Sequence, residues 1–115
     1  MDGDRLIAMF RAIDAADWTA LAAFWHPDAV YERPGYEPLT GRDRVLRFYR
    51  DERVISSGTH RVEGVVIEDG RGAAWGSMRG VRKDGEPVSL GFADVYHFQD
   101  ATILRRRSHF FVPAV

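Results

Sequence analysis

PVSLGFADVYHF, at residues 87–98, is rich in β-branched and aromatic side chains, and its bulkier residues recur at every second position. Similar runs occupy residues 58–69, 72–83 and 102–113. The pairs Asp69-Gly70, Asp84-Gly85 and Gln99-Asp100 separate these runs, and such residues favour tight turns. The second half of the chain therefore predicts four consecutive antiparallel strands.

The first half of the chain has the spacing of helices instead. Residues 4–15 place apolar side chains three or four positions apart, which predicts a helix with one buried face. Asp17 is suited to cap a second, shorter helix over residues 18–25, and a third helix is expected over residues 43–53. A short strand at residues 29–32 and a loop rich in proline and glycine lie between the second and third helices.

Helices followed by a sheet indicate one α+β domain that spans residues 1–115. We expect a cone-shaped α+β barrel, with three N-terminal helices packed on a strongly curved antiparallel sheet that is mixed at its edge. A curved sheet covered by helices on one face leaves a cone whose wide end can hold a ligand.

Composition excludes several classes of function. The 16 basic and 17 acidic side chains leave a net charge of about −1, which creates no field that gathers nucleic acid or anionic lipid. Cysteine is absent, so disulfides and thiolate metal sites are excluded. The chain starts without the basic and apolar segments of a signal peptide, and no apolar run approaches the roughly 18 residues of a membrane span. We expect a cytoplasmic protein that binds neither nucleic acid nor membrane.

No metal or cofactor is expected. The histidines at positions 26, 60, 97 and 109 lack metal-ligand spacing, and no Gly-rich phosphate loop or nucleophile elbow is present. His60 begins the first long strand and can reach the rim of a pocket, although a solvated histidine is the simpler interpretation. His97 is expected to point away from Asp94, because neighbouring residues on a strand face opposite sides.

Asp94 is the strongest candidate for chemistry. On the strand at 87–98 it shares a face with Phe92 and Tyr96, and this bulkier face should lie toward the helices. A carboxylate on an apolar face is costly unless it is paired or holds a proton, and such groups concentrate at functional sites. The alternative is a structural Asp satisfied by backbone N–H groups or by an arginine.

Two arginines are candidate partners for Asp94. Arg106 shares a face with Leu104, Ser108 and Phe110, and alternation leaves open whether this face points inward. Arg79 shares a face with Trp75 and Ser77, opposite a row of smaller residues, and its direction is equally open. An inward arginine could neutralise Asp94 or hold a carboxylate or enolate oxygen of a ligand, whereas an outward one would simply be solvated.

Several motifs resemble those of a known family. In the first half these are Ala29-Val30-Tyr31-Glu32-Arg33-Pro34, Leu39-Thr40-Gly41-Arg42 and Phe48-Tyr49. In the second half they are Gly85-Glu86-Pro87, Asp94-Val95-Tyr96-His97-Phe98 and the final strand from Ile103. In this order they resemble the ketosteroid isomerase and SnoaL-like proteins of the nuclear transport factor 2-like superfamily. The resemblance is specific for the fold, which hosts isomerases, polyketide cyclases, epoxide hydrolases, dehydratases and non-catalytic binders.

The resemblance also places individual residues. It puts Asp94 where the steroid isomerases keep a protonated Asp in the oxyanion hole and where SnoaL-like cyclases place an acid/base Asp. The isomerase general base corresponds to Arg33, preceded by Glu32, and the isomerase oxyanion tyrosine corresponds to Met9. A true steroid isomerase is therefore not expected.

The same matching implies that Tyr49 and Trp25 occupy places of pocket tyrosines. It directs six further side chains into the cavity, namely Trp75, Ser77, Arg79, Arg106, Ser108 and Phe110. The epoxide hydrolases of this fold use an Asp–Arg–Asp set, and Ser108 replaces the last of these aspartates.

The favoured function is acid/base chemistry on a small apolar carbonyl compound, of the polyketide cyclase, isomerase or dehydratase kind. Asp94 would move the proton, with Arg106, Arg79 and Glu32 as further catalytic candidates. The expected substrate-binding residues are Trp25, Tyr31, Tyr49, Trp75, Ser77, Phe92, Tyr96, Ser108 and Phe110.

Two alternatives remain open from sequence. One is hydrolysis of an epoxide by water that Asp94 or Glu32 activates. The other is a binding or dimerisation module without catalysis, in which the cavity is small or filled and Asp94 is in a salt bridge. Under each of these a homodimer is expected through the outer face of the sheet, with Ala93, Val95, Ile103 and Phe111 as candidate contacts.

Overall fold

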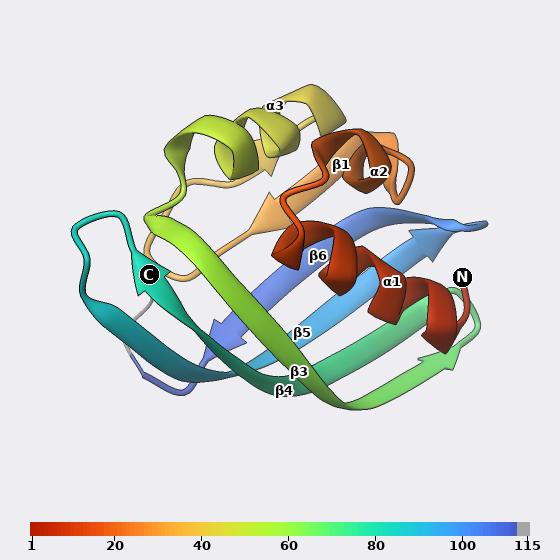
Figure 1. Cartoon of the computed structure of the whole chain (residues 1–115). Helices are drawn as coiled ribbons and strands as arrows, with labels where there is room; N and C mark the ends of the chain where they lie inside the picture. Colours follow the sequence, from red (N-terminus) through yellow and green to blue (C-terminus); the bar gives the residue numbers. More distant parts are fainter. Residues whose placement is uncertain (113–115) are drawn as a thin grey trace.

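The computed structural model of the chain describes residues 1–112 and shows helices packed against one face of a curved sheet (Figure 1). In chain order the elements are α1 (Gly3–Asp14), α2 (Trp18–Ala22), β1 (Trp25–Glu32), β2 (Leu39–Thr40), α3 (Arg42–Arg47), the π-helical turn η1 (Phe48–Glu52), β3 (Ile55–Glu68), β4 (Arg71–Arg82), β5 (Pro87–Gln99) and β6 (Thr102–Phe110). The predicted α+β class, with three helices before the long strands, is confirmed.

The strands form one six-stranded sheet in the order β2-β1-β6-β5-β4-β3. The last four strands of the chain pair antiparallel with their neighbours, as the turn residues predict. β1 instead pairs parallel with β6, which makes the sheet mixed toward that edge. β2 and β3 lie at the two ends of this order, so the cone stays open rather than closing into a complete barrel.

Element boundaries differ from the predictions in a few places. Asp17 caps α2 by accepting the backbone N–H of Ala20 at 3.1 Å, as expected. However, α2 ends at Ala22, and Trp25, which was expected in this helix, is the first residue of β1. Pro27 is tolerated there because the pairing of β1 with β6 is irregular between Trp25 and Val30. The last strand ends at Phe110, and residue 113 of its predicted range lies outside the described residues.

Glycines on β4 permit the strong curvature of the sheet. A Cβ atom at Gly76 would overlap the carbonyl oxygen of Arg61, and one at Gly80 would overlap that of Ser57. Both oxygens belong to the backbone of β3, which bends closely over β4 at these positions. The concave side of β4 is therefore occupied by neighbouring backbone and not by large side chains.

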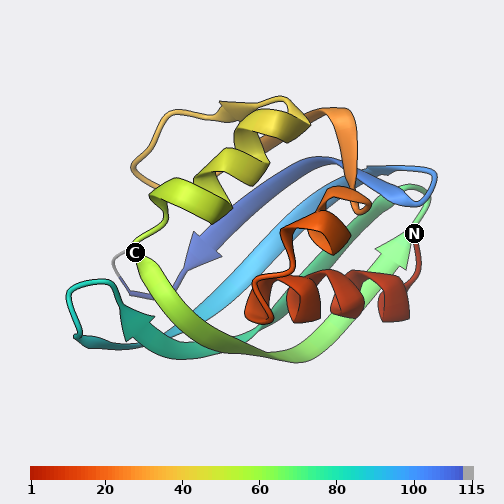
Figure 2. The same cartoon turned by 45° about the horizontal axis from the view of Figure 1, so that its top comes forward.

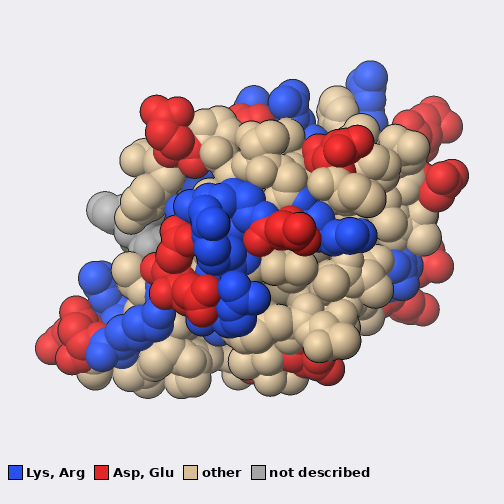
Figure 3. Space-filling model, turned by 90° about the horizontal axis from the view of Figure 1, so that it is seen from above, with Lys and Arg blue, Asp and Glu red and all other residues tan. Residues whose placement is uncertain are grey.

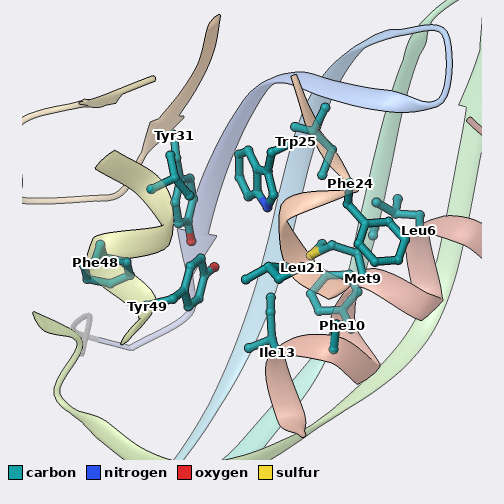
Figure 4. Packing of buried hydrophobic residues seen from close by; sticks show 14 of the residues in the cluster. Leu6, Met9, Phe10, Ile13, Leu21, Phe24, Trp25, Tyr31, Phe48 and Tyr49 are labelled. Atoms are coloured by element: carbon teal, nitrogen blue, oxygen red, sulfur yellow. The ribbon is translucent and has the colours of Figure 1, made fainter. Parts of the chain in front are cut away.

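The helices lie over the concave face of the sheet (Figure 2), and the hydrophobic core fills the space between them. α1 packs along β3, while α3 packs on β1. The apolar face of α1 buries Leu6, Met9, Phe10 and Ile13, as its spacing predicts (Figure 4). α1 and α3 therefore cover different parts of the sheet, and the candidate site forms in the space between them.

Charged side chains are interleaved over the surface above α3 (Figure 3). Arg44 and Arg47 bond to Glu52, and Arg50 bonds to Asp51, so positive and negative groups largely neutralise one another locally. Within residues 1–112, no helix has both the length and the apolar character required to cross a membrane.

Candidate functional site

A buried ion pair joins Asp94 of β5 to Arg106 of β6. Oδ2 of Asp94 accepts hydrogen bonds from Nε of Arg106 at 3.0 Å and from Nη2 at 2.8 Å. The hydroxyl of Tyr96 donates to the same oxygen at 2.8 Å. Asp94 is 1% exposed and Arg106 is 3% exposed, so the pair is shielded from water. Strand alternation predicted the inward direction of Asp94, and Arg106 is the arginine that neutralises it.

Arg106 also polarises a tyrosine. Its Nη1 donates to the hydroxyl oxygen of Tyr49 at 2.7 Å, which leaves the hydroxyl hydrogen of Tyr49 available to another acceptor. Burial disfavours the charged guanidinium, but the charges of Asp94 and the nearby tyrosines outweigh this effect and hold the pKa of Arg106 well above its usual value. Arg106 is thus a permanent cation, and each of its three side-chain nitrogen atoms donates to a defined partner.

The neighbouring tyrosines remain neutral. Burial raises the pKa of Tyr31 far above its usual value, and it raises that of Tyr96 as well. The Tyr31 hydroxyl is hydrogen-bonded to Oγ of Ser108 at 2.9 Å. The rings of Tyr31 and Tyr49 stack with centroids 6.2 Å apart (Figure 4).

A narrow cavity of about 70 Å³ adjoins this network. Its buried lining includes Tyr31, Tyr49, Phe92, Asp94 and Arg106. The remaining buried lining is apolar: Ile13, Phe48, Ile55, Met78 and Leu90. Half-buried residues complete it and form its rim: Asp14, Arg33, Arg53, Val54, Gly58, His60 and Phe110. The cavity is thus mostly apolar with a few ionisable groups, as ligand sites usually are.

Asp94 presents a buried oxygen without a hydrogen-bond partner to the cavity. Oδ1 of Asp94 is buried and accepts no hydrogen bond from any residue of the described chain, while Oδ2 accepts three. A buried carboxylate oxygen without a donor is unfavourable, because it loses water and gains nothing in exchange. A ligand hydroxyl in the cavity would satisfy it.

A second ionisable pair lies on the rim. Nδ1 of His60 on β3 lies 2.6 Å from Oδ1 of Asp14 at the end of α1. Oδ2 of Asp14 accepts the backbone N–H of His60 at 2.9 Å and an N–H of Arg11 at 3.3 Å. A carboxylate can only accept, so the hydrogen of the neutral His60 ring is placed on Nδ1, and Nε2 is left as an acceptor.

A family model described as the SnoaL-like domain matches residues 6–106. The chain belongs to the SnoaL-like domain family. No curated protein sequence matches it. The family assignment agrees with the resemblance carried by the motifs in both halves of the sequence.

Solved structures share the fold of this SnoaL-like domain at low sequence identity. A nuclear transport factor 2-like protein of unknown function from Burkholderia pseudomallei K96243 has a TM-score of 0.84 and 19% identity, and the alignment covers 93% of this chain and 88% of that one. A LEH-like epoxide hydrolase from M. tuberculosis has a TM-score of 0.82 and 17% identity, with 93% and 80% covered. A protein described as a SnoaL-like polyketide cyclase from Jannaschia sp. CCS1 has a TM-score of 0.81 and 12% identity, with 94% and 83% covered.

The prediction that Trp75, Ser77 and Arg79 of β4 point into the cavity is wrong for this SnoaL-like domain. Trp75 is 41% exposed, Arg79 is exposed, and Ser77 shares their row on the outer face of the sheet. The inward row consists of small residues with Met78, because the backbone of β3 crosses closely over this side of β4. Arg79 therefore does not approach Asp94.

Other predicted site residues are buried without lining the cavity. Trp25 packs against Tyr31, with ring centroids 5.8 Å apart, in the core behind the site. Tyr96 and Ser108 act through their hydrogen bonds to Asp94 and Tyr31. Glu32 faces away, because Tyr31 beside it points inward, and its carboxylate pairs with Arg105 and Arg107 on the outer side. The water-activating role suggested for Glu32 has no support from this position.

Sequence patterns did not single out the His60–Asp14 pair. The two residues are 46 positions apart and meet only because α1 packs on β3. Position on the first long strand was the one available signal, and it suggested only that His60 can reach the rim. Among residues 1–112, no group of three or more His, Asp or Glu side chains is arranged to hold a metal ion.

Proposed function

We propose that this SnoaL-like domain catalyses cofactor-independent proton transfer on a small apolar carbonyl compound, as polyketide cyclases, isomerases and dehydratases do. One observation carries the proposal. His60, oriented by Asp14, and Tyr49, polarised by Arg106, line the same apolar cavity. A base and a hydrogen-bond donor on one cavity are what removal of a proton beside a carbonyl group requires.

His60 is the proposed base. Asp14 holds the imidazole through Nδ1 and stabilises the imidazolium that forms when Nε2 takes a proton. The proton leaves the carbon next to the carbonyl, and the electron pair of that C–H bond forms the carbon–carbon double bond of an enolate. Return of the proton from Nε2 to another carbon or oxygen completes an isomerisation, and loss of a β-hydroxyl group as water completes a dehydration.

Tyr49 is the proposed donor to the enolate oxygen. Its hydroxyl accepts from the cationic Arg106, which strengthens its own donation to a developing negative charge. Asp94 then serves chiefly as the counter-ion that fixes Arg106, and its free Oδ1 can accept a hydrogen bond from a hydroxyl group of the ligand. This differs from the sequence-based hypothesis, in which Asp94 itself moves the proton.

Relatives support the class of chemistry but not the substrate. The structures that share this fold include proteins described as an epoxide hydrolase and a polyketide cyclase. For epoxide hydrolysis, Ser108 lies opposite Asp94 on the neighbouring strand, where a second carboxylate would be needed. A non-catalytic binding module is the better supported alternative, because the cavity is narrow and Asp94 is held in an ion pair.

Deuterium exchange tests the proposal without knowledge of the substrate. Small ketones and keto acids, such as 2-butanone, 2-oxobutanoate and levulinate, are incubated with the protein in D₂O, and loss of the α-proton signal is followed by NMR. We expect the wild type to accelerate exchange of at least one probe, and His60→Gln or Asp14→Asn to reduce this acceleration by about 10²–10⁴-fold. The outward Arg79→Gln variant is expected to match the wild type.

Two outcomes of this experiment decide between the functions. Acceleration that persists in His60→Gln but disappears in Asp94→Asn, with folding intact, would indicate that Asp94 and not His60 transfers the proton. Ligand binding without exchange of any probe would favour the binding module.

A homodimer through the outer face of the sheet is also proposed. Val95 is 46% exposed and Phe111 is 92% exposed, which leaves apolar surface on that side. Ile103, expected to contribute, is instead fully buried, because the pairing of β5 with β6 shifts between His97 and Phe98. Sedimentation of the wild type and of Val95→Glu tests the dimer, which the charged variant should weaken.

A further inference from the structure

Two arginines of the cavity rim have no charged partner. Arg33 follows β1 and Arg53 follows η1, and both line the cavity. Neither guanidinium forms an ion pair or a hydrogen bond with any residue between positions 1 and 112, and Nε of Arg33 is buried without an acceptor. Each guanidinium carries five N–H donors, and aromatic rings do not accept all of them, so unused hydrogen-bond donors remain at the rim.

Other arginines close to the site have charged partners. Arg44, Arg47 and Arg50 next to the site pair with Glu52 or Asp51. Inside the cavity, Asp94 neutralises Arg106. On the rim, Asp14 interacts with His60 and Arg11. Arg33 and Arg53 therefore remain as uncompensated positive charges beside an apolar cavity.

Aromatic rings hold both guanidinium groups in place. The guanidinium carbon of Arg33 lies 3.8 Å from the ring centre of Phe48 and 4.3 Å from that of Tyr36. That of Arg53 lies 5.4 Å from the ring of Trp18 and 5.8 Å from that of Tyr49. Rings satisfy the flat faces of a guanidinium but leave its in-plane N–H groups free to meet an anion.

Burial without an anion is unfavourable for such groups. Burial lowers the pKa of Arg53 below its usual value. Electrostatic interactions with Tyr49 and Asp14 raise it, but they only partly oppose the effect of burial. Removing a guanidinium group from water costs free energy. Where no anionic side chain of the protein compensates this cost, a bound anionic ligand can do so.

We infer that the ligand of this cavity is a small carboxylate, with its apolar part beside Phe92 and its carboxylate between Arg33 and Arg53. This inference rests on the proposed function only in naming the substrate class of the same cavity. A carboxylate accepts two parallel N–H groups from a guanidinium, which matches the free in-plane donors of both arginines. For the proposed chemistry, the substrate class becomes small keto or hydroxy acids.

Cavity size restricts the apolar part. The volume of about 70 Å³ is smaller than the roughly 150 Å³ of an engineered cavity that admits benzene. An apolar part of about three or four carbon atoms is therefore expected inside, while the carboxylate remains at the half-buried rim.

Matched pairs of carboxylate and amide test this inference. Butyrate and butyramide have nearly the same shape but differ in charge, and their affinities are measured by calorimetry or by NMR titration. We expect butyrate to bind about tenfold or more tightly than butyramide, with the preference weakening as salt is added. Equal affinities, or no binding of either probe up to its solubility limit, would overturn the inference.

Variants locate the preference within the rim. Arg33→Gln and Arg53→Gln should each reduce the butyrate-to-butyramide ratio about fivefold or more, whereas Arg53→Lys should retain part of it. Arg71→Gln removes one positive charge from an exposed position of β4 outside the cavity, and its ratio should equal that of the wild type. An unchanged ratio in both rim variants, with thermal melts showing intact folding, would also overturn the inference.

Failure of this inference and failure of the proposed function give different results. Binding needs no turnover, so a preference for carboxylates without α-proton exchange would support the proposed ligand class and contradict the proposed catalysis. Exchange of neutral ketones without a preference for carboxylates would support the proposed catalysis and contradict the proposed ligand class.

Discussion

Removal of one partner of the Asp94–Arg106 pair should be strongly destabilising. The side chains are almost fully buried, and Arg106→Met would leave the Asp94 carboxylate with Tyr96 as its remaining donor. Loss of one member of a buried ion pair costs about 3–5 kcal/mol of unfolding free energy, because the remaining charge stays desolvated. For a domain of this size the midpoint of thermal unfolding should fall by on the order of 12–20 °C.

The double variant Asp94→Leu/Arg106→Met separates the pair from its surroundings. With both charges replaced by apolar groups of similar volume, most of the loss should be recovered. Some destabilisation should remain, about 1–3 kcal/mol, because the Tyr96 hydroxyl loses its acceptor. The two single variants and the double variant should therefore be non-additive by at least about 3 kcal/mol.

Chemical denaturation monitored by tryptophan fluorescence and thermal unfolding monitored by circular dichroism provide the measurements. Asp51→Asn, in an exposed pair with Arg50, is the control and should leave the unfolding midpoint unchanged. Additive single effects, or a loss below about 1 kcal/mol in either single variant, would refute the conclusion that the pair is buried and mutually dependent.

Three further predictions concern neighbouring features. Tyr49→Phe should lower the unfolding midpoint modestly, because Nη1 of Arg106 loses its acceptor, and should reduce the acceleration of α-proton exchange by about 10²–10³-fold, since the donor to the enolate is lost; an unchanged rate excludes Tyr49 from that role. Gly76→Ala should unfold the domain or lower its melting temperature sharply, because the added methyl overlaps the Arg61 carbonyl, whereas Gly91→Ala meets only ordinary contacts and should be tolerated in the same melts. Trp75→Ala should leave butyrate affinity unchanged in calorimetric titration, because Trp75 lies on the outer face.

Strand alternation was sufficient to place Asp94. One strand that carries bulky residues on a single face has only one favourable orientation, and Phe92, Asp94 and Tyr96 all point inward as expected. The order of elements likewise gave the fold class, since helices that precede a meander must cover one of its faces.

Alternation alone left the inward row of β4 undecided, and the resemblance to the family assigned the wrong row, for a steric reason. The bulkier row, which includes Trp75 and Arg79, was expected inside, but the close approach of β3 to Gly76 leaves no room for it. Ile103 was assigned to the wrong face because a shift in strand pairing reverses alternation at that point. Neither the bend nor the shift has a signature in residue spacing.

Contacts between distant elements were beyond prediction from the sequence. Asp14 and His60 meet through the packing of a helix on a strand, and no spacing rule connects them. Arg33 and Arg53 become noteworthy only when the partners of all neighbouring arginines are known. Resemblance to the family gave the cavity, whereas the groups that define its chemistry depend on this chain's own contacts.

The proton position on His60 tests the proposed site most directly. Nitrogen-15 NMR of the labelled protein distinguishes the two neutral forms of the imidazole ring, and a titration with 2-butanone shows which nitrogen meets a ligand. We predict hydrogen on Nδ1, toward Asp14, and a bare Nε2 whose signal shifts as the ketone binds. Hydrogen on Nε2 with a bare Nδ1, or an Nε2 signal that does not respond to bound ketone, would contradict a proton-accepting role for His60.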